Sequence, residues 1–92
     1  MEERDPLLKA VAARIRALRE SRKIAQEVFA YKAGIDRSYY GAIERGKYSP
    51  TAINLAKIAV ALGVEVGELF PPCEELAQLL SADPATEASA HT

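Results

Sequence analysis

The stretch QEVFAYKAGIDRSYYGAIERGK, residues 26–47, decides the fold of this chain. It contains two short patterns with the apolar spacing of α-helices. The first spans residues 26–32. The second begins at Asp36, a residue type that caps helix N-termini, and runs to Arg45. Gly46 follows at the position where a left-handed residue commonly ends a helix.

Only Ala33, Gly34 and Ile35 separate the two patterns. Two helices joined by so short a glycine-containing turn cross steeply, which is the geometry of a helix-turn-helix. In this motif the second helix stands out from the domain and can enter the major groove of DNA. The stretch therefore predicts a DNA-binding element, which the remaining segments are expected to support.

The flanking sequence predicts an all-α fold. Apolar residues three and four positions apart predict a helix over residues 5–22, with Asp5 as N-cap and Pro6 in the first turn. Residues 51–62 predict another helix, and because it has few polar residues we expect it to be buried on more than one side. A final short helix is expected around residues 66–70.

We expect three parts along the chain. Residues 1–72 form the helix-turn-helix domain, residues 73–81 a short amphipathic helix, and residues 82–92 a disordered tail of small, polar residues. The short helix carries leucines at helical spacing. Because so short a helix is marginal alone, it needs a surface to lie on and is a possible dimer contact, together with residues 51–62 or 66–70.

Charge is distributed unevenly along the chain. The whole sequence has a net charge of −1. Residues 4–57 hold all 12 basic residues and 5 acidic ones, a net charge of +7, whereas residues 58–92 hold 6 acidic residues and no lysine or arginine. Solvated helix faces of mixed charge would account for part of this asymmetry. A basic working surface with an acidic remainder is the interpretation that fits a nucleic-acid partner.

Composition argues against several classes of protein. No apolar run approaches the roughly 20 residues that span a bilayer, and the first residues lack the order of a signal peptide. The single cysteine, Cys73, and the single histidine, His91, predict neither a disulfide nor a metal or catalytic cluster. We therefore expect a cytoplasmic protein that is not an enzyme, with no cofactor, no membrane contact and no small-molecule ligand.

Three segments match one known family in order and spacing. They are LLKAVAARIRALRE (7–20), QEVFAYKAGIDRSYYGAIERGKYSP (26–50) and LAKIAVALGVEVGELF (55–70). Together they resemble the Cro/C1-type (XRE) helix-turn-helix transcriptional regulators. AYKAGIDRSYY followed by IERG is most similar to the small controller proteins of restriction–modification operons. The resemblance implies a five-helix, lambda-repressor-like domain that binds a palindromic or pseudopalindromic DNA operator as a homodimer.

The resemblance also implies which residues touch DNA. Arg37, Ser38 and Ala42 would face base edges from the exposed side of the second helix, with Arg37 donating to guanine O6 and N7. Gln26 would hydrogen-bond a phosphate at the start of the first helix. Further contacts to the DNA backbone are expected from Tyr39, Arg45, Lys47, Tyr48, Arg14 and Arg16.

Some residues depart from the family pattern. Lys23 stands where a glycine usually ends the helix before the motif, and Ala25 stands where a serine or threonine usually caps the motif's first helix. The missing cap costs about 1 kcal/mol. Tyr40 replaces an aliphatic residue, so its hydroxyl needs water or a partner. Glu44, acidic beside the DNA-binding face, is expected to pair with a nearby arginine or to cap the following loop.

A protein-interaction module is the alternative function. An antitoxin-type helix-turn-helix subunit would use the acidic segment after Ile58 and the leucines at positions 76, 79 and 80 to bind another protein. Residues 73–92 are short for such a partner-binding segment. We therefore favour a sequence-specific DNA-binding regulator.

Overall fold

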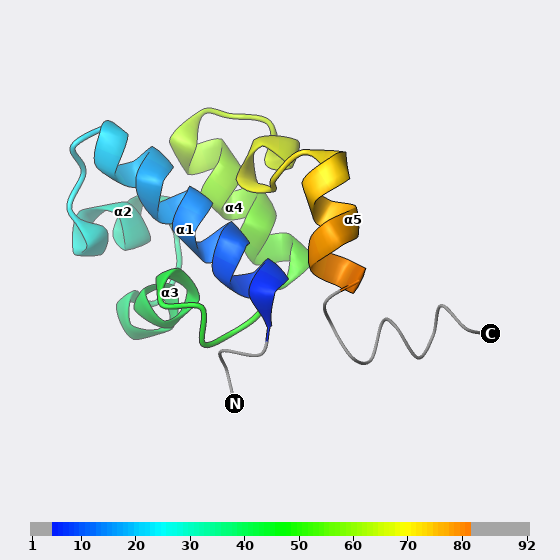
Figure 1. Cartoon of the computed structure of the whole chain (residues 1–92). Helices are drawn as coiled ribbons and strands as arrows, with labels where there is room; N and C mark the ends of the chain where they lie inside the picture. Colours follow the sequence, from blue (N-terminus) through cyan, green and yellow to red (C-terminus); the bar gives the residue numbers. More distant parts are fainter. Residues whose placement is uncertain (1–4, 82–92) are drawn as a thin grey trace.

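The computed structural model describes residues 5–81 of the chain. Within them, five α-helices and one 3₁₀ helix follow one another without a β-strand, which confirms the all-α prediction (Figure 1). The elements are α1 (Pro6–Ser21), α2 (Gln26–Ala33), α3 (Arg37–Glu44), α4 (Ala52–Leu62), the 3₁₀ helix η2 (Val66–Leu69) and α5 (Cys73–Ser81). None of these helices has the length and apolarity to cross a membrane. The tail predicted over 82–92, with His91, lies outside the described residues.

Local sequence sets most helix ends. The Asp5 carboxylate accepts a hydrogen bond from a first-turn backbone N–H of α1 at 3.0 Å, and the Asp36 carboxylate does the same for α3 at 3.1 Å. Both predicted N-caps are therefore confirmed. Ala25 supplies no side-chain cap to α2, as expected. Gly46 follows α3 with a φ of 72°, the left-handed value that few residues other than glycine adopt.

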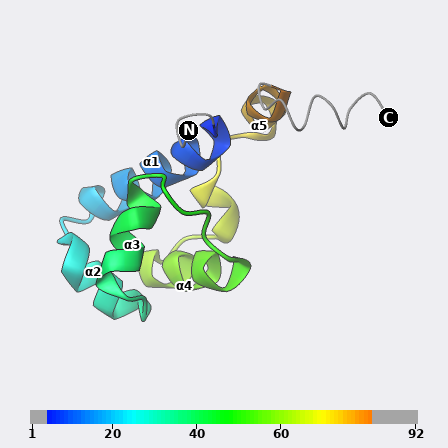
Figure 2. The ribbon, with the colours of Figure 1, turned by 90° about the horizontal axis from the view of Figure 1, so that it is seen from below.

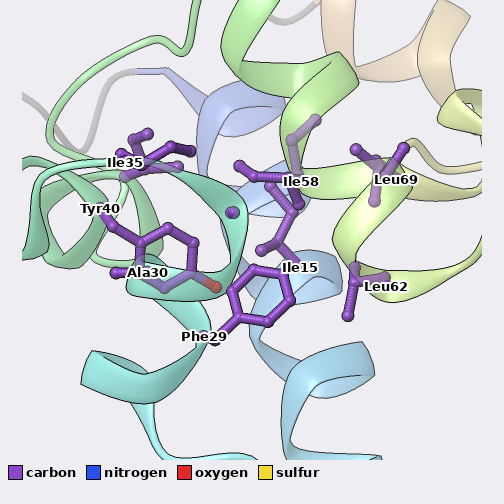
Figure 3. Close-up of a cluster of buried hydrophobic side chains, with 12 residues drawn as sticks. Ile15, Phe29, Ala30, Ile35, Tyr40, Ile58, Leu62 and Leu69 are labelled. Atoms are coloured by element: carbon purple, nitrogen blue, oxygen red, sulfur yellow. The ribbon is translucent and has the colours of Figure 1, made fainter.

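The core lies where α1, α2, α3 and α4 meet (Figure 3). The Phe29 and Tyr40 rings pack against each other there, with centroids 5.3 Å apart. Burial of each large apolar side chain stabilises the fold by about 1.5–3 kcal/mol. The largest fully buried side chains are Tyr40, Phe29, Ile15, Ile43, Ile58 and Leu69.

α4 is less buried than its sequence predicts. Ile53 is 69% exposed and Val60 is 81% exposed, so the expectation of burial on more than one side is wrong. The neighbours of α4 are α1, α2 and η2. They cover the face that carries Ile58 and Leu62, and no described helix covers the opposite face, which remains open to solvent.

α5 packs against α1, which supplies the surface that the short helix was expected to need. Leu76 and Leu79 are half-buried there. α5 and α2 lie at opposite ends of the molecule in both views (Figures 1 and 2). The exposed face of α4 borders α2. The leucine stripe and this face of α4 are therefore separate surfaces of one chain.

Lys23, in the link between α1 and α2, adopts a left-handed conformation with a φ of 57°. Its backbone N–H donates to the Glu20 carbonyl at 2.9 Å, which closes the end of α1. A residue with a Cβ atom is disfavoured in this conformation by about 1–2 kcal/mol. The backbone thus has the conformation suited to the family's usual glycine, although a lysine occupies the position.

Candidate nucleic-acid interface

A buried polar network around Glu44 fixes α3 to α1 and α2. Arg19 of α1 donates through Nε at 2.7 Å and through Nη2 at 3.1 Å to the two carboxylate oxygens. Gln26 of α2 donates through Nε2 at 3.0 Å, and the Tyr40 hydroxyl donates from within α3. The Glu44 side chain is only 2% exposed. Since charge-assisted bidentate bonds are both strong and directional, the network sets the orientation of α3.

Ionisation states in the network follow from these contacts. Burial acts to raise the pKa of Glu44, but the hydrogen bonds from Arg19, Tyr40 and Gln26 outweigh it and lower the pKa below its ordinary value. Burial and the hydrogen bond to Glu44 raise the pKa of Tyr40 far above its ordinary value. At neutral pH, Glu44 is therefore ionised and Tyr40 is a neutral donor. The expected arginine partner of Glu44 and hydrogen-bond partner of Tyr40 are both confirmed.

The first turn of α3 is open, in contrast to this network. Arg37 and Ser38 are exposed, and their side chains make no hydrogen bond or ion pair within the described residues. Asp36 holds the backbone of this turn through its N-cap bond. A guanidinium and a hydroxyl on the first turn of such a helix have the chemistry needed to read base edges in a major groove.

Ala42 does not reach the surface. It is 4% exposed, so its predicted exposure is wrong, and Gly41 beside it is also buried. The Lys47 backbone N–H donates to the Ala42 carbonyl at 3.0 Å, because the chain turns back at the end of α3. At 4% exposure, the Ala42 methyl group does not reach a base edge. Ala42 is therefore removed from the set of base-reading residues.

The Gln26 side chain lies at the start of α2, beside the second turn of α3. One amide N–H of Gln26 is engaged by Glu44, and Oε1 points toward Gly41. The side chain expected to bind a phosphate is thus partly committed inside the protein. Its second amide hydrogen and the backbone N–H groups of the helix start are the donors left for an anion.

Of the two α1 arginines expected to contact DNA, only Arg16 lies on the side of α3. Arg16 borders a shallow surface with Arg45, whereas Arg14 donates to the Glu68 carbonyl of η2 at 2.8 Å. Residues two positions apart on a helix point in different directions, so both arginines could not share one face. The Arg14 guanidinium is therefore engaged by η2, on a different side of α1 from Arg16.

Lys9 is a candidate that the sequence reasoning missed. It is exposed and borders the same surface as Arg16 and Arg45. Its Cγ atom lies 3.5 Å from the position that a Cβ atom would take at Gly46. Lys9 precedes Arg16 by seven residues, two helical turns, and this spacing was the available signal.

The loop after α3 is attached to the helix by an aromatic pair. The Tyr39 and Tyr48 rings stack with centroids 5.7 Å apart and an interplanar angle of 27°. Lys47, the neighbour of Tyr48, is exposed. The structure thus brings the expected backbone contacts Tyr39 and Tyr48 together, with Lys47 next to Tyr48 in the chain.

Known proteins are similar to this chain in sequence. The helix-turn-helix family HTH_3 matches residues 15–69. The control protein C.MunI of a Mycoplasma species is 40% identical over 57 residues, which cover 62% of this chain and 77% of that protein. The immunity repressor of Bacillus phage phi105 is 42% identical over 59 residues, which cover 64% of this chain and 41% of the repressor.

Solved structures agree with the sequence comparison. The restriction–modification controller protein C.AhdI from Aeromonas hydrophila superposes with a TM-score of 0.67 at 41% identity, over 68% of this chain and 96% of that chain. The hypothetical transcription factor NHTF from Neisseria superposes with a TM-score of 0.70 at 33% identity, over 83% and 87%. These relatives are transcriptional regulators and controller proteins rather than enzymes. The chain therefore belongs to the XRE-type HTH_3 family of DNA-binding transcriptional regulators.

Proposed function

We propose that this regulator binds a palindromic or pseudopalindromic operator as a homodimer and controls a restriction–modification operon. The observation that carries the proposal is the pair of exposed, unengaged side chains Arg37 and Ser38 on the first turn of a rigidly held α3. The likeness to C.MunI and C.AhdI supports the assignment to a restriction–modification system.

Recognition begins at the first turn of α3. Arg37 donates two hydrogen bonds to O6 and N7 of a guanine, and Ser38 bonds an adjacent base edge. The DNA backbone is held on both sides of this turn, which fixes the register of the helix in the groove. We assign the contacts to the DNA backbone to Gln26, Tyr39, Arg45, Lys47, Tyr48, Arg16 and Lys9.

Replacement of Arg37 tests base reading. Selection of bound duplexes from a random DNA pool first defines the half-site and its spacing. Arg37→Ala should then lose about 1–3 kcal/mol of the preference for the selected site over a scrambled duplex, measured by gel-shift titration. Its unfolding free energy should stay within about 0.5 kcal/mol of wild type, because Arg37 is exposed.

Arg14→Ala is the matched control, since it removes an arginine from the side of α1 that faces η2. It should leave the preference between the two duplexes unchanged. An Arg37→Ala protein that still separates selected from scrambled DNA as well as wild type would exclude base reading by Arg37.

The exposed face of α4 supports the homodimer. Ile53 and Val60 lie seven residues apart and border an apolar groove between α2 and α4. Lys57 also lines this groove, where its Nζ atom donates to the Gly34 carbonyl at the end of α2 at 3.3 Å. Two copies that pair through α4 would cover these side chains and present two copies of α3 to successive half-sites.

Val60→Lys tests this interface. It adds a positive charge to a face that already carries Lys32 and Lys57, so two copies should repel each other. In sedimentation equilibrium at tens of micromolar, wild type should be a dimer and the variant a monomer with wild-type helicity. A wild-type protein that is monomeric under these conditions would exclude the homodimer.

The identity of the controlled operon is tested by the genes beside this one. Neighbouring methyltransferase and nuclease genes, with the selected operator in their promoter region, are the expected outcome. An operator found only elsewhere would leave a DNA-binding regulator that is not a restriction–modification controller.

A further inference from the structure

Gly41 lies inside α3, where a glycine costs about 1 kcal/mol relative to alanine. Its backbone needs no left-handed conformation. A Cβ atom at this position would approach two side chains: Arg45 Nη1 at 3.2 Å and Gln26 Oε1 at 3.4 Å. Because Gly41 has no side chain, the ends of two polar side chains, rather than apolar core residues, lie close to its Cα atom.

Arg45 reaches this space because it follows Gly41 by one helical turn. Side chains on a helix tilt toward its N-terminus, so the Arg45 guanidinium lies back over the residue four positions earlier. Arg45 is exposed and forms no ion pair within the described residues. Its neighbour Glu44 is unavailable, since Arg19, Gln26 and Tyr40 already occupy that carboxylate.

The Gln26 side chain comes to the same space from α2 and is held there by Glu44. Its oxygen faces the guanidinium side of the gap, and its amide retains one uncommitted hydrogen. The Arg45 guanidinium of α3 and the Gln26 side chain of α2 thus meet around Gly41, with the Gln26 oxygen toward Gly41 and its amide nitrogen toward Glu44. A planar guanidinium beside an amide donor is well suited to the oxygens of a phosphodiester.

We infer that Gly41 is a positioning residue for DNA binding: its missing side chain seats the Arg45 guanidinium beside Gln26, so that α2 and α3 bind one backbone phosphate together. This inference rests on the proposed DNA-binding role. It also explains why a helix-weakening residue stands in the centre of α3.

Gly41→Ala in the full chain separates this role from a structural one. Alanine favours the helix, and the atoms it meets are flexible side-chain ends, so the thermal midpoint should rise, by about 4–8 °C for 1 kcal/mol in a domain of this size. Affinity should fall by roughly tenfold for the selected and the scrambled duplex alike, because a phosphate contact carries no sequence information. The slope of log affinity against log salt should fall by about 0.9.

Arg45→Ala should reproduce the loss of affinity and of salt slope, and the double variant Gly41→Ala/Arg45→Ala should lose no more than Arg45→Ala alone. Gly67→Ala is the matched control, because nothing lies within 4 Å of its Cβ position. It should leave DNA affinity unchanged.

A Gly41→Ala protein that is destabilised, that binds as tightly as wild type, or whose loss adds to that of Arg45→Ala would overturn the inference. If the wild-type protein binds no duplex, the proposed function fails with it. If wild type shows an Arg37-dependent preference but Gly41→Ala binds normally, only the inference about Gly41 fails.

Discussion

The two ends of α3 are built differently, although the helix is only eight residues long. At the C-terminal end, Glu44 is enclosed and accepts hydrogen bonds from residues of three helices. At the N-terminal end, Arg37 and Ser38 face solvent without internal partners. Because contacts at its C-terminal end fix the orientation of α3, the side chains at its N-terminal end can remain without internal partners and still be held in position. Such preorganisation lowers the entropy cost of binding.

Removal of the Glu44 carboxylate should have the largest effect on this arrangement. Glu44→Ala leaves the Arg19 guanidinium buried without its partner, so the unfolding free energy should fall by about 3–5 kcal/mol in denaturant titration. Glu20→Ala is the control, because the exposed pair between Arg16 and Glu20 should contribute about 1 kcal/mol or less. Similar losses of stability in the two variants would contradict a special role for the C-terminal end of α3, where Glu44 is enclosed.

Low pH should weaken the hydrogen bonds that hold the C-terminal end of α3 in the wild-type protein. The folded-state pKa of Glu44 lies below its ordinary value of 4.5, so its contribution to stability is present above that pH and is lost as pH falls through the folded-state pKa. Glu44→Gln, compared across pH 3–7 by thermal unfolding, should show a shallower acid decline than wild type. An unchanged acid decline would show that other groups cause it.

High pH should also lower the stability of the fold, in this case through ionisation of Tyr40. Its folded-state pKa lies above the ordinary value of 10.0, so the neutral phenol stabilises the fold below that pH and the contribution is lost as pH rises further. Tyr40→Phe should remove this alkaline decline in the same unfolding measurement. A variant that declines as steeply as wild type would assign the effect elsewhere.

Loss of the Asp36 cap should weaken the N-terminal end of α3, which carries Arg37 and Ser38. Asp36→Ala removes the hydrogen bond to the Tyr39 N–H and should cost about 1 kcal/mol of unfolding free energy. It should also reduce the preference for the selected operator, since the reading turn frays. Thr51→Ala removes the equivalent cap of α4 and should cost a similar amount of stability without changing the DNA preference.

Lys23→Gly should change neither end of α3. Glycine relieves the left-handed strain at this position, so after its larger loss of chain entropy the unfolding free energy should rise by about 0.5–1 kcal/mol. DNA preference should match wild type. A destabilised Lys23→Gly protein would indicate that the lysine side chain makes a favourable contact.

Much of the candidate site was accessible from the sequence because it depends on short-range order. The helix ends at Asp5, Asp36 and Gly46 follow from residues within one turn, and the exposure of Arg37 and Ser38 follows from their place at a capped helix start. Errors arose where the environment comes from distant segments. Ala42 lies in α3, which packs against α1 and α2, and it is only 4% exposed.

The order of the helices, the helix-turn-helix and the residues at its reading turn follow from the sequence alone, because capping, periodicity and turn chemistry act within three or four residues. The partners of the buried and long-range contacts depend on the tertiary structure. Arg19 meets Glu44 across 25 positions and Arg14 meets Glu68 across 54, whereas α4 keeps one apolar face in solvent. Such contacts depend on how helices pack in space, and no local pattern encodes which side of a helix its neighbours will cover.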